Sequence, residues 1–445
     1  MTAPATVSPA RACAFAVLRR VFEAGAYADR AFTAQAAGLD ARERAFSMNL
    51  AYGTVQRRAT LDYVGALLCA RALDQVDPPV LAALRLGLYQ LLFLSGVADH
   101  AAVNECVELV KRAGGGGAGL VNAVLRRGAR EGQAILDAMT DCDPEQAAVK
   151  HSVPVWLAQR WWSELGAQRA LALLRAVNEP AESALRANTL RIARAEVLAR
   201  LPIPAHPVPE LGEGVILDAP FDVRGSELWR AGAIMAQSRA SMLVACVLAP
   251  QPGERVLDLC AAPGAKTTHI AALMGGEGQV VAVEAHHGRA KALIDTCARM
   301  GAACVRVQLG DARNFSARAP FDRVLVDPPC SGLGTLQSRP DLRWRPSPAS
   351  VLELSALQSE ILAAGARATA AGGVLVYSVC TISRAEGGEV IERFLRAHRD
   401  FAALELSLEH PRWGCGLHLQ LLPYRDGTDG FFVAALRRSY STSNG

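Results

Sequence analysis

Apolar side chains recur every three or four positions through residues 1–142, which predicts a series of amphipathic helices. Ser8 is typical of a helix start and Gly25 of a helix end, while Asp40 and Asp77 mark the starts of further helices. No alternating strand pattern interrupts the series. We therefore expect a compact all-α domain over residues 1–142.

The pattern changes between residues 143 and 250. A helix there carries Trp161 and Trp162, which we interpret as core residues, and short apolar runs at 185–190 and 215–217 predict strands. Prolines between residues 202 and 209 indicate turns. This composition is typical of a small α+β connector domain over 143–250.

From residue 251 to residue 440, strand-like and helix-like patterns alternate. Strands are predicted at 255–259, 279–284, 305–309, 323–327 and 374–378. Alternation of this kind predicts a parallel sheet with helices on both faces. The runs 419–422 and 431–436 predict an antiparallel hairpin that closes one edge of that sheet.

Composition narrows the class of protein further. Hydrophobic residues make up 51% of the chain, which favours well-buried globular domains. The eleven cysteines form no CxxC pair, so we expect free thiols in a reducing compartment and no metal site. No apolar run is long enough to span a bilayer, and the N-terminus lacks a secretion signal, so we expect a cytoplasmic protein without a membrane partner. The net charge of +4 does not by itself establish nucleic-acid binding.

The loop that follows the strand at 255–259 is the first candidate for chemistry. Residues 260–265 are small and lead into a helix, an arrangement that places backbone N–H groups at the carboxyl edge of a sheet. Neither GxGxxG nor GxxxxGK[ST] is present, which argues against a nucleotide-phosphate loop. Asp258 ends the strand and can meet a cation. S-adenosylmethionine, with its amino group and sulfonium, fits these features.

Acidic residues end the next two strands. Glu284 can accept hydrogen bonds from ribose hydroxyls, and Asp311 is placed to meet an adenine amino group. Each acid alone is best explained as a surface charge. Three acids at three consecutive strand ends favour a nucleoside cofactor.

Two cysteines stand at the ends of the last two parallel strands. Asp327-Pro-Pro-Cys330 follows one strand and Cys380 follows the other, so in the usual strand order both thiols face one pocket. A thiolate that adds to C6 of cytosine makes C5 nucleophilic, and a base must later remove the C5 proton. Two cysteines can divide these tasks, Asp327 can hold the ring, and Lys266 can orient Asp327 or lower a thiol pKa.

These motifs resemble a known family. DLCAAPGAKT at 258–267, GDA at 310–312, DPPCSG at 327–332 and YSVCT at 377–381 are similar to the RsmB/Sun family of RNA cytosine-5 methyltransferases. The stretches 100–105 and 121–126 resemble the helical RNA-binding domain of the NusB antitermination factor, which points to the 16S rRNA branch of that family. Arg19, Arg20, Arg57, Arg58, Arg126 and Arg127 are candidates for phosphate contacts or, equally, for solvated helix faces.

The resemblance implies three domains: a NusB-like all-α domain, a small α+β connector, and a Rossmann-like class I methyltransferase domain over 251–440. It implies that Cys380 is the nucleophile and that Cys330 assists release of the product, two roles that spacing alone does not assign. The partner implied is 16S rRNA, with S-adenosylmethionine as the cofactor and a monomeric protein. The expected cofactor contacts are Asp258, Cys260, Ala261, Ala262, Pro263, Gly264, Ala265, Lys266, Glu284, Arg289, Asp311 and Asp327.

Four positions depart from the family pattern. Ser238 replaces an acid, Ala265 a glycine, Val379 a threonine, and Gly387 lies where an asparagine is usual. None of them removes a residue that the chemistry requires. Two alternatives stay open: a cytosine-5 methyltransferase for tRNA or another rRNA site, and a catalytically inactive RNA-binding or antitermination factor.

Overall fold

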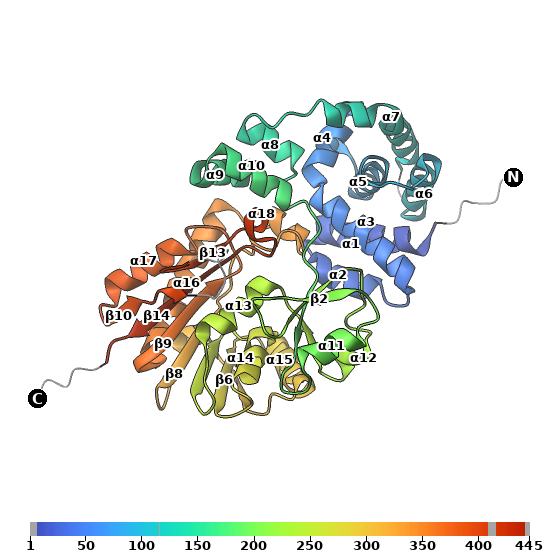
Figure 1. The fold of residues 1–445 in the computed structure, drawn as a ribbon. Helices are drawn as coiled ribbons and strands as arrows, with labels where there is room; N and C mark the ends of the chain where they lie inside the picture. The colour runs from blue at the N-terminus through green and yellow to red at the C-terminus, as the bar shows by residue number, and fades with distance from the viewer. Residues whose placement is uncertain (1–6, 115, 408–414, 441–445) are drawn as a thin grey trace, which may run out of the picture. The chain divides into compact units, whose positions relative to one another are not determined.

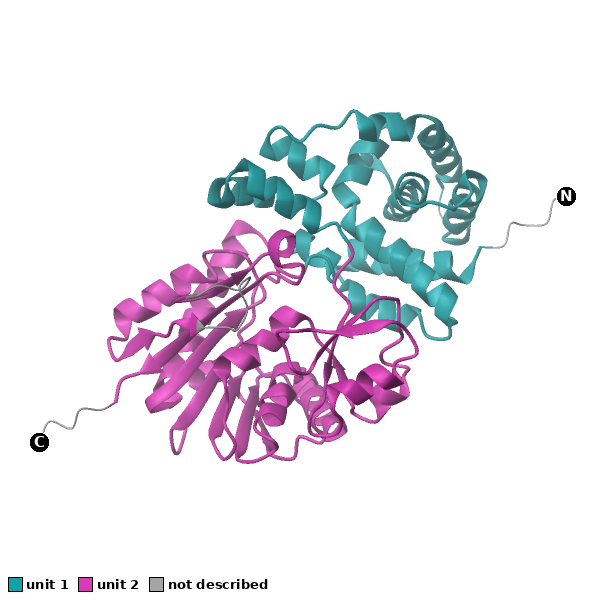
Figure 2. Cartoon of the chain, viewed as in Figure 1, with its two compact units in different colours: residues 1–179, 336–345 teal, residues 180–335, 346–445 magenta. Residues whose placement is uncertain are grey.

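The computed structural model describes residues 7–114, 116–407 and 415–440. The chain divides into two compact units, coloured separately in Figure 2. The first comprises Met1–Glu179 together with Leu336–Arg345, and the second comprises Pro180–Thr335 together with Pro346–Gly445.

The first unit is helical throughout its described residues. The helical pattern predicted over 1–142 lies within it, but so do residues 143–179, which the sequence pattern assigned to the connector domain. Ser8 is the N-cap of α1, Gly25 ends that helix at φ 63°, and the Asp40 side chain accepts from the backbone N–H of Glu43 at the start of α3. The unit contains α1 (Pro9–Ala24), α2 (Ala28–Gln35), α3 (Ala41–Gln56), α4 (Arg58–Leu68), η1 (Leu73–Gln75), α5 (Pro78–Phe93), α6 (Asp99–Arg112), α7 (Ala118–Asp137), α8 (Pro144–Lys150), α9 (Val155–Leu165), α10 (Ala167–Ala176) and η3 (Pro340–Trp344).

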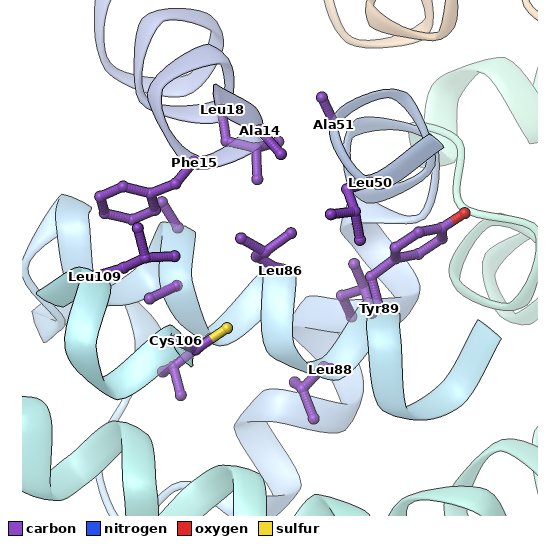
Figure 3. Packing of buried hydrophobic residues seen from close by; sticks show 14 of the residues in the cluster. Ala14, Phe15, Leu18, Leu50, Ala51, Leu86, Leu88, Tyr89, Cys106 and Leu109 are labelled. Atoms are coloured by element: carbon purple, nitrogen blue, oxygen red, sulfur yellow. The ribbon is translucent and has the colours of Figure 1, made fainter. Parts of the chain in front are cut away.

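Helix α5 is the centre of this unit. Leu86 and Leu88 of α5 belong to one buried apolar cluster with Leu18 of α1, Leu50 of α3 and Leu109 of α6, and Figure 3 shows Leu86 facing Leu18 and Leu50. Contacts on several sides explain why α5 is apolar around most of its circumference. Among the described residues, no helix is long and apolar enough to cross a membrane.

The segment Leu336–Arg345 belongs to the helical unit although most of its neighbours in sequence lie in the other unit. Arg343 is fully buried, and its NH1 donates to the carbonyls of Gln56 and Ser152 at 3.2 and 3.0 Å. The NH2 group donates to the carbonyl of Val177 at 3.0 Å. One arginine therefore satisfies carbonyls from three separate parts of the helical unit.

The second unit begins with a small antiparallel sheet of order β2-β3-β1-β4. Two of its strands match the runs predicted at 185–190 and 215–217. The elements are β1 (Ala184–Ala187), α11 (Arg194–Arg200), β2 (Ala205–Pro207), β3 (Gly214–Leu217), α12 (Glu227–Arg230) and β4 (Ile234–Ala236), followed by α13 (Arg239–Leu248).

A larger sheet of order β10-β14-β9-β8-β5-β6-β7 carries the candidate chemistry (Figure 1). The strands β5 to β9 are parallel, and β14 is antiparallel to β9. The strands are β5 (Arg255–Leu259), β6 (Gln279–Glu284), β7 (Val305–Leu309), β8 (Phe321–Val326), β9 (Thr369–Val379), β10 (Phe401–Ala403), β13 (Leu419–Leu421) and β14 (Phe431–Arg438), and a separate ribbon pairs β11 (Leu406–Ser407) with β12 (Cys415–Gly416).

Helices cover both faces of this sheet, which confirms the predicted α/β arrangement. One apolar cluster joins α13 and α14 to one face, and another joins α16 and α17 to the opposite face. The predicted hairpin of β13 and β14 is present, but β10 also pairs with β14 on the same side and was not expected. The remaining elements are α14 (Ala265–Leu273), α15 (His287–Met300), η2 (Ala312–Asn314), α16 (Pro348–Ala368), α17 (Gly388–Ala397) and α18 (Pro423–Asp426).

Candidate active site

The loop between β5 and α14 has an unusual backbone. Cys260 adopts φ +66°, the peptide between Ala262 and Pro263 is cis, and Gly264 adopts φ +103° immediately before the helix. A Cβ at Gly264 would lie 2.8 Å from the Leu293 side chain, so glycine is required there for conformation and for space. The helix begins at Ala265, where the first turn leaves N–H groups without intrahelical acceptors.

Asp258, at the end of β5, is a buried acceptor. The Thr267 hydroxyl donates to its Oδ2 at 2.6 Å, whereas its Oδ1 makes no hydrogen bond within the described residues. Burial raises the pKa of Asp258 to about 7. An acceptor with unused capacity beside a helix N-terminus suits a ligand that carries a positive amino group.

Glu284 is the last residue of β6, and Asp311 follows β7. Because β6 and β7 pair in parallel, both acids lie at the same edge of the sheet. The Glu284 side chain is buried, and its Oε1 accepts from the backbone N–H of His286 at 2.9 Å. Arg289 lies 3.4 Å from the Glu284 carboxylate and donates to the carbonyl of Ala262 at 2.9 Å. Asp311 instead forms an ion pair with Arg313 at 2.6 Å.

Lys266 and Asp327 form an ion pair across this edge. The Lys266 Nζ lies 2.6 Å from Asp327 Oδ2, and the Ser378 hydroxyl donates to Asp327 Oδ1 at 2.8 Å. Burial opposes the charge of Lys266, but the attraction and hydrogen bond of Asp327, together with the charges of Cys380 and Asp258, outweigh it and raise the lysine pKa. The predicted orientation of Asp327 by Lys266 is therefore present.

The two cysteines meet, as predicted. Because β8 and β9 are adjacent and parallel, the loops that follow them lie together, and the Sγ atoms of Cys330 and Cys380 are 3.2 Å apart. The hydrogen bond between Cys330 and Cys380 is the main cause that raises the pKa of Cys330 well above the usual value for a thiol, and burial is the second cause. The pair can hold one thiolate and one thiol, and the nearby Lys266 ammonium favours the charged form of Cys380.

Comparison with known proteins identifies the family. A "Probable ribosomal RNA small subunit methyltransferase B" from Bacillus subtilis is 36% identical over 413 residues, covering 90% of this chain and 92% of that protein. The chain belongs to the 16S rRNA methyltransferase RsmB/F family. Residues 245–437 match the model of that family, residues 8–130 match the NusB family, and residues 153–224 match a ferredoxin-like domain of RsmF/B-like methyltransferases.

Two further relatives agree with this assignment. The ribosomal RNA small subunit methyltransferase B of Thermus thermophilus is 36% identical and covers 89% of each chain. The crystal structure of PH0851 has a TM-score of 0.78 and 27% identity, covering 98% of this chain and 100% of that one. These matches confirm the predicted resemblance and fold class, and the RsmB/F chain described here is a methyltransferase.

The departures from the RsmB/F pattern have local explanations. Ser238 is the N-cap of α13, and its side chain accepts from the backbone N–H of Ser241. Ala265 starts α14 with an ordinary helical backbone, because Gly264 takes the positive φ, and Val379 is fully buried. A Cβ at Gly387 would lie 2.9 Å from the Phe432 ring, so an asparagine would require that ring to shift.

Several arginines proposed for RNA are already engaged within the helical unit. Arg19 pairs with Glu23 at 2.8 Å, and Arg127 pairs with Glu131 at 2.7 Å. Arg57 lies over the Phe93 ring, whereas Arg126 and Arg20 are exposed. Arg58 lies 3.9 Å from Asp62, and Arg127 is exposed but paired, so Arg20 and Arg126 best retain donors for a phosphate.

The sequence did not reveal a buried carboxylate, that of Glu386, between the two cysteine loops. Its side chain is fully buried and accepts from the backbone N–H of Ser331 at 2.8 Å. The available signal was a glutamate close after the second cysteine motif.

Proposed function

We propose that this RsmB/F chain methylates C5 of a cytosine in 16S rRNA, with S-adenosylmethionine as the methyl donor and a covalent bond between Cys380 and C6. The observation that carries the proposal is the 3.2 Å separation of the Cys330 and Cys380 sulfurs beside the Lys266–Asp327 pair. Its cellular setting would be the cytoplasm.

The loop at the end of β5 fits the cofactor. Asp258 retains an unused buried acceptor, Glu284 offers a carboxylate at the neighbouring strand end, and Arg289 ties helix α15 to the loop through Ala262. These three residues, with residues 260–266, Asp311 and Asp327, would hold S-adenosylmethionine. When bound, this cofactor supplies an electrophilic methyl group to C5.

The cysteines divide the remaining chemistry. The Cys380 thiolate donates an electron pair to C6, and the π electrons of the C5–C6 bond become available at C5. After methylation the C5 proton must leave, and its electrons expel the Cys380 thiolate and restore the ring. We assign this step to Cys330, whose sulfur lies beside that of Cys380. Once the Cys380 sulfur is bonded to C6, the Cys330 thiol gives its proton to solvent, and the resulting thiolate accepts the C5 proton.

Asp327 positions the base. Its carboxylate, held by Lys266 and Ser378, can accept from the exocyclic amine of cytosine or from a protonated N3. Protonation at N3 makes C6 more electrophilic. Because stacking hides C6 in a duplex, the substrate would be a single-stranded or extruded cytosine.

Substitution of the two cysteines tests this function. Cys380→Ser should abolish methyl transfer to 16S rRNA, whereas Cys330→Ala should accumulate a protein–RNA adduct that migrates slowly on a denaturing gel. Cys142→Ala, at an exposed thiol, is the matched control. Methylation by Cys380→Ser at the wild-type rate would refute the mechanism.

The identity of the RNA needs a separate measurement. Bisulfite sequencing of rRNA and tRNA from cells with and without the protein should lose one 5-methylcytosine in 16S rRNA. Loss from tRNA or another rRNA would support the first alternative. No loss, together with RNA binding and no thermal stabilisation by S-adenosylmethionine, would support an inactive RNA-binding factor.

A further inference from the structure

The proposed mechanism of methyl transfer assigns no role to Glu386. It lies in the turn between β9 and α17, and its side chain is fully buried in the second unit. Burial of a carboxylate is costly unless its oxygens are well satisfied, so this position is informative.

Four donors converge on this carboxylate. Oε1 accepts from the Ser331 backbone N–H at 2.8 Å and from Gln358 Nε2 at 3.1 Å. Oε2 accepts from the Ser331 hydroxyl at 2.5 Å and from the Thr381 hydroxyl at 3.2 Å. Ser331 directly follows Cys330, and Thr381 directly follows Cys380, so one carboxylate joins the two cysteine loops.

Further contacts make this junction rigid. Gln358 of α16 also donates to the carbonyl of Pro329 at 3.0 Å, so the residues on both sides of Cys330 are held. The hydroxyls of Ser331 and Thr381 lie 3.0 Å apart, and the Tyr377 hydroxyl donates to the backbone carbonyl of Glu386 at 2.6 Å. A small displacement of this network would change the separation of the sulfurs.

The negative charge of Glu386 also acts on the two thiols, because its four hydrogen-bond donors are neutral groups that do not cancel that charge. Among the described side chains, Glu386 and Tyr377 interact electrostatically with Cys330, and Lys266 interacts with Cys380. Asp327 and Arg393 act one step further out, on Tyr377. After the Cys380 hydrogen bond and burial, the negative charges of Cys380 and Glu386 also raise the pKa of Cys330. The negative charge of Glu386 therefore opposes a second ionisation in the thiol pair.

We propose that Glu386 is a positioning residue for methyl transfer: it fixes the two cysteine loops against each other and places a negative charge beside Cys330. This inference rests on the proposed function. A glutamine of the same size would retain part of the geometry but would lose the charge and one acceptor oxygen.

The test compares Glu386→Gln with Glu386→Asp and with Glu392→Gln, an exposed glutamate on α17 that undergoes the same change. Steady-state methylation of 16S rRNA is measured across pH with saturating S-adenosylmethionine, and thermal melting verifies folding. For Glu386→Gln we expect kcat to fall about 10- to 100-fold with little change in the KM for S-adenosylmethionine. The alkaline limb of its pH profile should move to lower pH, because the second ionisation of the thiol pair becomes easier.

Glu386→Asp keeps the charge, so it should lower the rate without moving the alkaline limb, and Glu392→Gln should match the wild type. A wild-type rate in Glu386→Gln, or a slow variant with an unshifted profile, would overturn the proposal. If Glu386→Gln does not fold, a wild-type rate in Glu386→Asp overturns it instead. Wild-type and Cys380→Ser proteins assayed in parallel report on the proposed function separately.

Discussion

At the scale of single residues, the site is organised by charges that are held in unusual surroundings. Lys266 is a buried ammonium that keeps its proton because Asp327 lies 2.6 Å away. The same ammonium favours a thiolate on Cys380. Removal of the Lys266 charge should therefore weaken both the binding of the cytosine ring by Asp327 and the activation of the Cys380 nucleophile.

Lys266→Met tests this dependence. We expect kcat for RNA methylation to fall about 100-fold, the size typical for loss of a preorganised electrostatic group. Alkylation of Cys380 by iodoacetamide at neutral pH should also slow. Lys291→Met, on the exposed side of α15, is the control and should leave both rates unchanged.

A second buried pair gives the second unit a pH-dependent stability. His269 of α14 lies 2.5 Å from the Glu213 carboxylate, and burial followed by the charge of Arg186 lowers the histidine pKa to about 4. The unfolded chain binds that proton at about pH 6.5, so the folded state loses stability as the pH falls from about 6.5 to about 4. The lowered pKa of Glu213 acts in the same direction.

His269→Gln should flatten this dependence, since the amide can still donate to Glu213 but does not titrate. The melting temperature measured at several values between pH 7 and pH 5 should fall less steeply than in the wild type. His100→Gln, at an exposed histidine of the helical unit, should keep the wild-type slope. Equal slopes for His269→Gln and the wild type would contradict the argument.

At the scale of elements, the site depends on three loops that approach at backbone distance. The Gly334 N–H donates to the carbonyl of Cys380 at 3.0 Å, and the Gly334 carbonyl accepts from Gly430 at 2.8 Å. Gly334 thereby links the first cysteine loop to the second and to the start of β14. A Cβ at Gly334 would lie 1.8 Å from the Gly430 carbonyl oxygen, which leaves no room for any side chain.

Gly334→Ala should therefore separate these loops. We expect a loss of stability of about 1–3 kcal/mol and a fall in methylation rate of about tenfold or more. Gly288→Ala is the matched control, since a Cβ there meets nothing within 4 Å, and the helix should be slightly stabilised. Chemical denaturation and a single-turnover assay measure the two effects.

Local patterns predicted most of the elements well. The strands at 255–259, 279–284 and 305–309 match β5, β6 and β7, because apolar runs between turn residues specify buried strands. The meeting of Cys330 with Cys380 followed from strand order. The carboxylate of Glu386 could not be predicted, because its burial depends on donors from three separate elements that no local pattern connects.

At the scale of the whole molecule, residues 143–179 and 336–345 belong to the helical unit and not to the domains expected from the sequence. Residues 336–345 are the more distant case. They lie between a cysteine motif and a helix of the methyltransferase domain, so proximity in sequence suggested that they belong there. In the structure, Arg343 and Trp344 are built into the helical unit, where Trp344 Nε1 donates to the carbonyl of Val55 at 2.8 Å. Hydrogen bonds between residues so far apart in the sequence produce no periodic pattern of hydrophobic and polar residues.

Arg343→Met should destabilise the helical unit by about 3 kcal/mol or more, because several buried carbonyls lose their donor at once. Hydrogen exchange should show faster opening of α3 and of the residues after α10, which provide those carbonyls. Arg42→Met, at an exposed arginine on α3, should change stability by less than about 0.5 kcal/mol. Unchanged protection in Arg343→Met would contradict this account.

The position of Arg343 in the chain also has a consequence for biosynthesis. The ribosome synthesises α1 to α10 early. The guanidinium of Arg343, which donates to backbone carbonyls of this unit, emerges only after β5 to β8 have left the ribosome. The N-terminal part of the nascent chain must therefore wait in an unfinished form, although most domains fold as soon as they are made. The helical unit can therefore reach its final structure only after the first cysteine motif has been synthesised.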